Sequence, residues 1–239
     1  MSPEFSVVVP VCNEAENVEP LAREIDAALA GRPYEMIFID DGSTDETATI
    51  LRRLKTALPA LRVLRHSFRS GQSAAVASGV RAASAPWIAT LDGDGQNDPA
   101  DIPKLIAARD ENRGVQLFMG NRKASRKDTA FRKLQSSVAN GVRSGLLGDD
   151  TPDTGCGIKL FAREVFMELP RFDHMHRFLP ALFMRHGARV ISIPVSHRAR
   201  TRGKSKYGML NRLWVGIVDI FGVMWLRRRY KSGLLVRED

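Results

Sequence analysis

The chain has 239 residues, of which 44% are hydrophobic and 26% are charged. This apolar content excludes a disordered tail or a low-complexity linker, and the length allows one large domain or two small ones. The sequence has 36 Lys and Arg residues and 27 Asp and Glu residues, so its formal net charge is +9. This charge predicts an anionic partner: nucleic acid, a membrane surface or a phosphorylated small molecule.

The first half of the chain alternates short aliphatic runs with helical patterns. Strands are expected at five aliphatic runs, 5–9, 36–39, 61–64, 87–91 and 115–119. Helices are expected between them, at about 16–29, at about 46–58 and from Gly71 onward. This alternation predicts right-handed βαβ units, and therefore an α/β fold with a mostly parallel central sheet and helices on both faces.

The second half begins with a polar, basic stretch. Residues 121–128 predict a loop, and the elements expected after it are a helix over 131–147, a helix over 178–184 and a strand over 190–195. A second basic loop, 197–206, leads to a long C-terminal helix over 209–230.

The most apolar stretch of the sequence, 214–226, lies in this last helix. It is shorter than the roughly 20 residues that span a bilayer, and it contains two tryptophans and precedes the basic cluster 227–231. Such a helix is typical of one lying in an anionic membrane interface; packing on the domain and dimerisation are the alternatives. We expect a domain over residues 1–208, and a C-terminal amphipathic, membrane-peripheral helix and tail over 209–239.

Three of the expected strands end in acidic clusters, which are Asn13-Glu14, Asp40-Asp41 and Asp92-Gly93-Asp94. Each cluster alone fits an ordinary turn, because Asp, Asn and Gly are common turn residues. The carboxyl ends of parallel strands, however, meet at one edge of a sheet, where ligands bind. Acids gathered there repel one another unless a cation or a donor-rich ligand offsets the repulsion, so the clusters predict a binding site.

The third cluster has the features of a metal site. Glycines flank Asp92 and Asp94, so the backbone can turn tightly and approach a ligand. Mg²⁺ and Mn²⁺ prefer oxygen ligands, often one or two carboxylates together with substrate phosphates. We therefore expect a metal that binds a diphosphate here.

Other site signatures are absent from the sequence. No G-x-G-x-x-G follows the first strand, and the G-K-S at 203–205 lacks the P-loop glycine, since Arg198 stands in its place. The five histidines are not spaced as zinc ligands. Two cysteines, Cys12 and Cys156, are too few for a disulfide framework, and the N-terminus lacks a signal-peptide pattern. We expect a reduced, cytoplasmic protein.

The motifs P-V-C-N-E at 10–14, D-D-G-S-T-D at 40–45 and D-G-D at 92–94 resemble, in this order, those of family 2 glycosyltransferases of the GT-A fold. That family transfers a sugar from a nucleotide-diphosphate donor. The resemblance implies that the donor nucleotide is bound by Pro10, Val11, Asn13, Glu14, Asp40, Asp41 and Asp92. It implies that Mg²⁺ or Mn²⁺ is held by Asp92, Asp94 and Gln96.

The second half resembles the dolichol-phosphate mannosyltransferase branch, in G-N-R at 120–122, in Arg132 with Ser136, in D-T-G-C-G-I-K at 153–159 and in R-T-R-G-K-S-K at 200–206. It departs from that branch at Ala199, Cys156 and Lys159, where Asp, Ser and Arg are more usual. The resemblance implies a polyprenyl phosphate acceptor and a hexose such as mannose. The implied acceptor-phosphate residues are Arg122, Arg132, Ser136, Arg200 and Lys206, and the implied catalytic residues are Asp92, Asp94, Arg122 and Arg132.

A phosphate acceptor determines the expected mechanism. A phosphomonoester has a second pKa of roughly 6, so it is already nucleophilic near neutral pH and needs no general base. Direct displacement implies inversion at the anomeric carbon. The expected enzyme is peripheral, on the cytoplasmic face of the membrane.

Two alternatives to this function stay open. A hydroxyl acceptor on a glycan or lipid would need a base, for which Asp153 is the candidate, and a nucleotide-sugar or polyanion-binding module would lack catalysis. Nucleic acid is not expected as a partner, because aromatic residues are only 7% and show no stacking pattern. The donor base, guanine or uracil, and the sugar (mannose, glucose, a uronic acid or an aminosugar) also stay open.

Overall fold

A computed structural model describes residues 2–123, 141, 143–149, 151–199 and 209–229, with side chains from residue 215 onward in the last of these ranges. Four of the expected acceptor-site residues lie outside the described residues; they are Arg132, Ser136, Arg200 and Lys206. Most of the helix expected over 131–147 lies outside them too.

The described strands form one seven-stranded sheet in the order β3-β2-β1-β4-β6-β5-β7. The strands are β1 (Phe5–Val11), β2 (Tyr34–Asp40), β3 (Leu61–Arg65), β4 (Trp87–Thr90), β5 (Val115–Asn121), β6 (Lys159–Ala162) and β7 (Arg189–Pro194). Only β6 runs against its neighbours, β4 and β5; the other described pairs are parallel. The expected α/β fold with a mostly parallel sheet is therefore confirmed.

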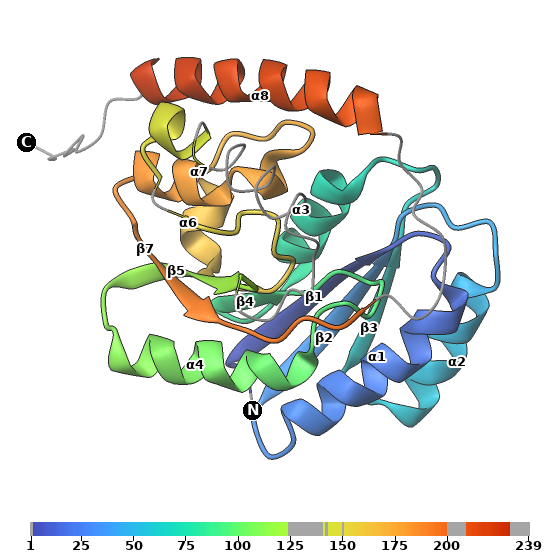
Figure 1. Ribbon diagram of the computed structural model, residues 1–239. Coiled ribbons are helices and arrows are strands. Elements are labelled where there is room, and N and C mark those ends of the chain that lie inside the picture. The colour runs from blue at the N-terminus through green and yellow to red at the C-terminus, as the bar shows by residue number, and fades with distance from the viewer. Residues whose placement is uncertain (1, 124–140, 142, 150, 200–208, 230–239) are drawn as a thin grey trace, which may run out of the picture.

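Helices cover both faces of the sheet (Figure 1). The helices are α1 (Ala15–Ala28), α2 (Thr47–Ala57), α3 (Gln72–Ala82), α4 (Ile102–Glu111), α6 (Arg163–Met167), α7 (Leu179–Arg185) and α8 (Met209–Arg229), with the short 3₁₀ turns η1 (Pro99–Asp101) and η2 (Met175–Arg177). Buried residues of α1, α2 and α4 share one core cluster, and those of α3, α6 and α7 share the other.

The alternation of side chains along β1 shows why both faces are covered. Val7 and Val9 belong to the first core cluster and Val8 to the second, and all three are fully buried. Successive strand side chains point to opposite faces. Because burying a valine is worth about 1.5–3 kcal/mol, a strand apolar on both sides is stable only between two helical layers.

The C-terminal helix α8 lies over α7, outside the layer formed by α3, α6 and α7 (Figure 1). Its buried Val223 and partly buried Ile220 and Met224 pack on the core. Phe221 and Trp225 are 64% and 59% exposed on the same helix. Among the described residues, no helix combines the length and the apolar character that crossing a membrane requires.

Candidate active site

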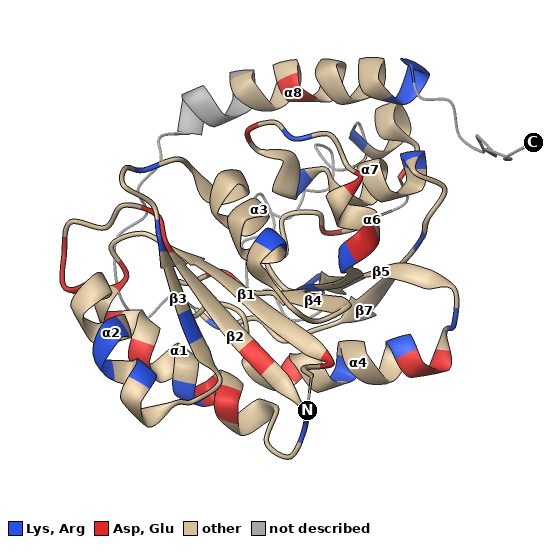
Figure 2. Cartoon of the chain, turned by 180° about the vertical axis from the view of Figure 1, so that it is seen from behind, with Lys and Arg blue, Asp and Glu red and all other residues tan. Residues whose placement is uncertain are grey.

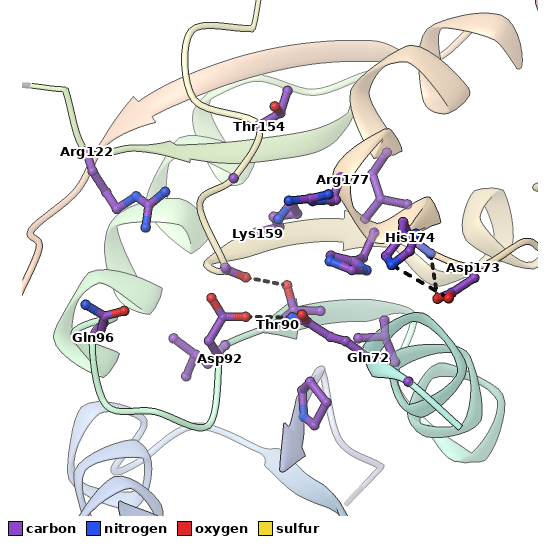
Figure 3. A pocket seen from close by; sticks show the side chains of 18 residues that line it. Gln72, Thr90, Asp92, Gln96, Arg122, Thr154, Lys159, Asp173, His174 and Arg177 are labelled. Carbon is purple, nitrogen blue, oxygen red and sulfur yellow. Dashed lines mark hydrogen bonds and ion pairs between the residues drawn. The ribbon is translucent and has the colours of Figure 1, made fainter. Parts of the chain in front are cut away.

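A pocket of about 430 Å³ opens beyond the carboxyl ends of β1 and β4 and the start of β6. The residues on its β1, α3 and β4 side are Pro10, Gly71, Gln72, Val76, Thr90, Leu91, Asp92 and Gln96. The residues on its other side come from the β5 end, the loop before β6, and the segment around η2: Arg122, Thr154, Gly155, Gly157, Lys159, Asp173, His174, His176, Arg177 and Leu179. In Figure 3, the cationic side chains gather across the pocket from Gln72 and Gln96.

Asp92 is held in the pocket by its neighbours. Gln72 Nε2 donates a hydrogen bond to Asp92 Oδ1 over 2.8 Å, and the Asp92 backbone N–H donates to Asn97 Oδ1 over 3.3 Å. A Cβ on Gly157 would lie 2.2 Å from Asp92 Oδ2. Only glycine leaves enough room at position 157, so the loop before β6 closes directly over the carboxylate.

Asp94, the second aspartate of the D-x-D motif, is placed differently from Asp92. Asp94 is not among the lining residues, and its Oδ1 accepts a hydrogen bond from the Gln96 backbone N–H over 3.1 Å. Gln96 itself lines the pocket. Burial, and after it the nearby charge of Asp94, raise the pKa of the Asp92 carboxyl. The two carboxylates are thus close enough to interact, and a cation between them would relieve both effects.

The first two motifs are joined to each other by hydrogen bonds. The Asn13 backbone N–H donates to Ser43 Oγ over 2.8 Å, and Asn13 Oδ1 accepts from the Thr44 N–H over 2.7 Å. The Glu14 backbone N–H donates to Thr47 Oγ1 over 2.9 Å. The structure therefore brings the 10–14 and 40–45 motifs together, as the sequence predicted.

The expected nucleotide residues differ in how they meet the pocket. Pro10 and Asp92 line it, whereas Val11 is 3% exposed in the core. Asp40 Oδ1 accepts from the Ser43 N–H over 2.9 Å, and its Oδ2 lies 3.2 Å from Arg65 Nε. The Asp40 carboxylate thus binds the turn that follows β2 and pairs with Arg65 of β3.

Asp41 connects the second motif to α3. Its Oδ1 accepts from the Ser70 N–H and its Oδ2 from the Gly71 N–H, both over 2.8 Å. His66 Nδ1 lies 2.7 Å from the same carboxylate. Gly71 has a φ of +92°, a backbone conformation that favours glycine. Asp41 therefore fixes the N-terminal end of the helix that carries Gln72.

Arg122 and Asp153 form a bidentate ion pair on the other side of the pocket. Arg122 Nε and Nη2 lie 2.8 and 2.9 Å from the two carboxylate oxygens, and the Arg122 backbone N–H donates to Oδ2 over 3.1 Å. The side chains are 13% and 7% exposed. This pairing raises the pKa of Arg122, outweighing the opposite effect of burial.

Lys159 stands at the start of β6, opposite Thr90 in the register of β4. It is 4% exposed, lines the pocket and donates a hydrogen bond from Nζ to the Cys156 carbonyl. Burial lowers the pKa of its ammonium group. Thr90 Oγ1 donates to the Gly157 carbonyl over 2.8 Å, which ties the preceding loop to β4.

His176 takes part in the site through α3. Its backbone N–H donates to Ser73 Oγ over 3.3 Å, and its Nδ1 lies 2.7 Å from the same oxygen. Burial and the charges of Lys159 and Arg177 lower its pKa to about 3. The ring is therefore neutral, and its Nδ1 shares a hydrogen bond with the Ser73 hydroxyl.

Among the pocket residues that were not assigned to the site from the sequence are Gln72, Lys159, His176 and Arg177. Lys159 was identified only as a departure from a resembling motif, and His176 as a polar residue at a helix start. No spacing pattern links them, since they come from α3, β6 and η2.

The chain belongs to glycosyl transferase family 2, whose family model matches residues 6–170. A similar relative is the dodecaprenyl-phosphate galacturonate synthase of Rhizobium johnstonii, 38% identical over 236 residues, which cover 96% of this chain and 68% of that protein. The undecaprenyl-phosphate 4-deoxy-4-formamido-L-arabinose transferase of Edwardsiella ictaluri is 34% identical over 209 residues, covering 86% of this chain and 63% of that one. The chain thus spans less than two thirds of this second relative. These names do not support the mannosyltransferase branch expected from the sequence.

Solved structures confirm the GT-A fold. The glucosyl-3-phosphoglycerate synthase of Mycobacterium tuberculosis, solved with Mn²⁺, UDP and glucosyl-3-phosphoglycerate, has a TM-score of 0.71 at 21% identity, covering 94% of this chain and 80% of that one. A mannosyltransferase of Pyrobaculum calidifontis, solved with GDP-mannose and Mn²⁺, has a TM-score of 0.67 at 19% identity, covering 98% and 66%.

Proposed function

We propose that this chain transfers a sugar from a nucleotide-diphosphate donor to a polyprenyl phosphate. The observation that carries the proposal is the single pocket in which Asp92 lies across from Arg122, Lys159 and Arg177. A carboxylate beside cations suits a reaction that brings together two anionic substrates. The names of the two relatives, a dodecaprenyl-phosphate galacturonate synthase and an undecaprenyl-phosphate sugar transferase, support a polyprenyl phosphate as the acceptor.

A divalent metal fits the residues of this site. Asp92 and Gln96 line the pocket, and burial and the charge of Asp94 raise the pKa of Asp92. Among the described residues, no group of three or more His, Cys, Asp or Glu side chains could hold a metal ion, so a bound ion would take part of its ligands from outside the chain. Mg²⁺ typically takes one or two carboxylates and completes its shell with water and substrate phosphates. We propose that Asp92, Asp94 and Gln96 hold Mg²⁺ or Mn²⁺, which when bound would stabilise the departing diphosphate.

The chain's own residues supply positioning and charge. Gln72 orients Asp92, and Asp41 orients the start of α3. Arg122, fixed by Asp153, would face the acceptor phosphate and reduce its repulsion from the donor. No described residue needs to remove a proton from a phosphate that is already ionised. We therefore propose direct displacement, which implies inversion at the anomeric carbon.

A hydroxyl acceptor is less compatible with the site. It would need a general base, and Asp153 was the candidate. Both oxygens of Asp153 are bound by Arg122, which stabilises the ionised carboxylate and makes it a poor proton acceptor.

We propose that residues 209–239 hold the protein against the cytoplasmic face of a membrane, beside the catalytic part over 1–208. Phe221 and Trp225 are exposed on α8, and its last turn carries Arg227, Arg228 and Arg229 (Figure 2). His174, which lines the pocket, has Nδ1 3.2 Å from Asp219 Oδ2 on α8. A membrane-bound α8 would therefore lie next to the pocket that must receive a lipid phosphate.

Vesicle sedimentation tests the membrane contact. The protein should sediment with vesicles of anionic phospholipid and not with zwitterionic ones, and the variant with Arg228→Gln and Arg229→Gln should lose most of this binding. The matched control is Arg52→Gln with Lys55→Gln, two exposed cations of α2. Equal sedimentation of both variants would contradict a role for α8.

Transfer is tested with a panel of UDP- and GDP-sugars, Mg²⁺ or Mn²⁺, and a short polyprenyl phosphate. We expect a lipid-linked product that is acid-labile, as a glycosyl phosphate is, and that depends on the lipid phosphate. Asp92→Ala and Asp94→Ala should each abolish it, whereas Glu111→Ala, which removes an exposed carboxylate at the end of α4, should not. Transfer that survives chelation or either Asp substitution would exclude the metal site.

A further inference from the structure

Lys159 is a buried cation with unused hydrogen-bonding capacity. It is 4% exposed, and its one hydrogen bond to a described residue goes to the Cys156 carbonyl. An ammonium group has three donors, and a lysine is almost never fully buried unless it is paired. No described carboxylate lies within ion-pair distance of Lys159, so its charge is available to an anionic ligand in the pocket.

Arg177 adds a second cation of the same kind. It lines the pocket from η2 and makes no ion pair with a described residue. Its charge and that of Lys159 both act on His176, so the two cations converge on one part of the pocket, as Figure 3 shows. Arg122 differs from both, because its guanidinium is already held in a bidentate ion pair with Asp153.

The order of the strands indicates which part of a donor would reach these cations. The nucleotide motifs follow β1 and β2, and Asp92 follows β4, the next strand in the sheet. Lys159 begins β6, one strand further on, and pairs with Thr90, two residues before Asp92. A donor with its diphosphate at Asp92 and its base toward β1 and β2 would therefore direct its sugar toward Lys159.

The chemistry of the two side chains fits a carboxylate. A guanidinium matches the planar carboxylate with two parallel hydrogen bonds, and an ammonium adds a point charge. A lipid phosphate would come from the membrane side. Lys159, at the floor of the pocket between β4 and β5, is better placed for a group that enters with the donor.

We propose that Lys159 and Arg177 bind a carboxylate on the donor sugar, so that this chain selects a nucleotide-activated uronic acid over the corresponding neutral hexose. This inference rests on the proposed function, because it assumes a nucleotide-sugar donor with its diphosphate at Asp92.

Donor binding to the full chain, measured by calorimetry with Mn²⁺, tests the proposal. Three pairs of donors differ only in the carboxylate: UDP-galacturonate and UDP-galactose, UDP-glucuronate and UDP-glucose, and GDP-mannuronate and GDP-mannose. In at least one pair the uronate should bind 10-fold or more tightly than the hexose. Arg177→Gln and Lys159→Met should each reduce that ratio to within 2-fold and leave the affinity for the free nucleoside diphosphate unchanged.

Control variants separate charge recognition from a damaged fold. Lys159→Arg keeps a cation at the buried position and should retain the preference for the uronate. Arg177 is only partly buried, so Arg177→Gln should fold even if Lys159→Met does not. Arg189→Gln removes an exposed arginine at the start of β7, at the other edge of the sheet, and should change nothing.

Two results would overturn the proposal. In the first, the hexose binds as well as the uronate in all three pairs. In the second, the variants keep the donor ratio but raise the KM for polyprenyl phosphate, which would assign these cations to the acceptor. Either result leaves the proposed transfer intact. If neither UDP nor GDP binds to the unaltered chain, the donor site itself is wrong and both proposals fall.

Discussion

Gln72 and Asp92 are joined by a hydrogen bond of 2.8 Å from Nε2 to Oδ1, although Gln72 opens α3 and Asp92 belongs to the D-x-D motif after β4. Gln72 is the first residue of α3, and the two backbone N–H groups just before it are bound by Asp41. The start of α3 therefore connects the acidic cluster after β2 to the one after β4. A substitution at Gln72 should therefore alter the proposed metal site through Asp92, without direct contact to the metal.

Gln72→Met tests this connection. Methionine keeps the length of the side chain but has no N–H, so the Asp92 carboxylate loses its fixed orientation. Residues that orient a metal ligand typically contribute 10–100-fold in affinity, and we expect the apparent Kd for Mn²⁺, titrated with the nucleoside diphosphate present, to rise roughly 10-fold. Gln116→Met is the matched control, because the Gln116 side chain bonds the Arg189 backbone on β7 instead. An unchanged Mn²⁺ titration for Gln72→Met would show that Asp92 does not need this support.

Gly157→Ala should destabilise the protein through crowding at Asp92. Its Cβ would lie 2.2 Å from Asp92 Oδ2 and 2.5 Å from Asn97 Oδ1, so the loop or the carboxylate must move. Overpacking of this kind typically costs about 1–3 kcal/mol. Gly155→Ala, in the same loop, meets nothing closer than 3.6 Å and should leave stability near that of the original chain. Urea unfolding compares the two, and equal losses would mean that the loop yields easily at position 157.

Asp153→Asn should cost stability because it leaves Arg122 without its charged partner. Both side chains are largely buried, and removing one partner of a buried ion pair typically costs about 3–5 kcal/mol. Arg122→Met combined with Asp153→Asn should cost less than the sum of the single changes, because the pair is then removed as a unit. Additive losses by urea unfolding would contradict the coupling.

The same variant also distinguishes the two acceptor chemistries. If Asp153 were a general base, Asp153→Asn would remove an ionisation from the pH profile of kcat. If Asp153 only positions Arg122, kcat falls and the KM for the lipid phosphate rises, while the shape of the profile is kept.

The fold was predictable where the chain is locally regular. The strands β1 to β5 are aliphatic runs, and β2 and β4 are followed by turns rich in Gly and Asp; these features are visible in any short window. β6 was missed, because Lys159–Ala162 is only four residues long and its antiparallel pairing with β4 and β5 is set by tertiary contacts. The C-terminal helix was predicted within one residue of its end at Arg229.

The candidate site was predictable on its acidic side and, on its cationic side, at Arg122. The D-x-D motif identified the edge of the sheet, but a sequence does not distinguish an aspartate that lines the pocket, as Asp92 does, from one whose Oδ1 holds a backbone turn, as in Asp94. Lys159 and Arg177 are 18 positions apart in sequence, and they share a pocket only because the fold brings β6 and η2 to it. That side of the pocket depends on long-range packing.

His176 should lower the stability of the protein in mild acid. Its pKa is about 3 in the folded chain, against an ordinary value of 6.5, because of burial and then the charges of Lys159 and Arg177. The unfolded chain therefore binds a proton between these values and the folded chain does not, so stability falls as the pH falls from about 6.5 to 3. One such proton changes the free energy of unfolding by up to roughly 1.4 kcal/mol per pH unit.

His176→Gln should flatten this dependence, since glutamine does not titrate. Ser73→Ala removes the hydrogen bond to Nδ1 but keeps the ring among the same cations, so the acid slope should remain. Urea unfolding at pH 7, 6, 5 and 4 measures all three chains. A slope that is the same with and without His176 would mean that the ring becomes protonated in the folded state, and the assignment of a neutral ring would then be wrong.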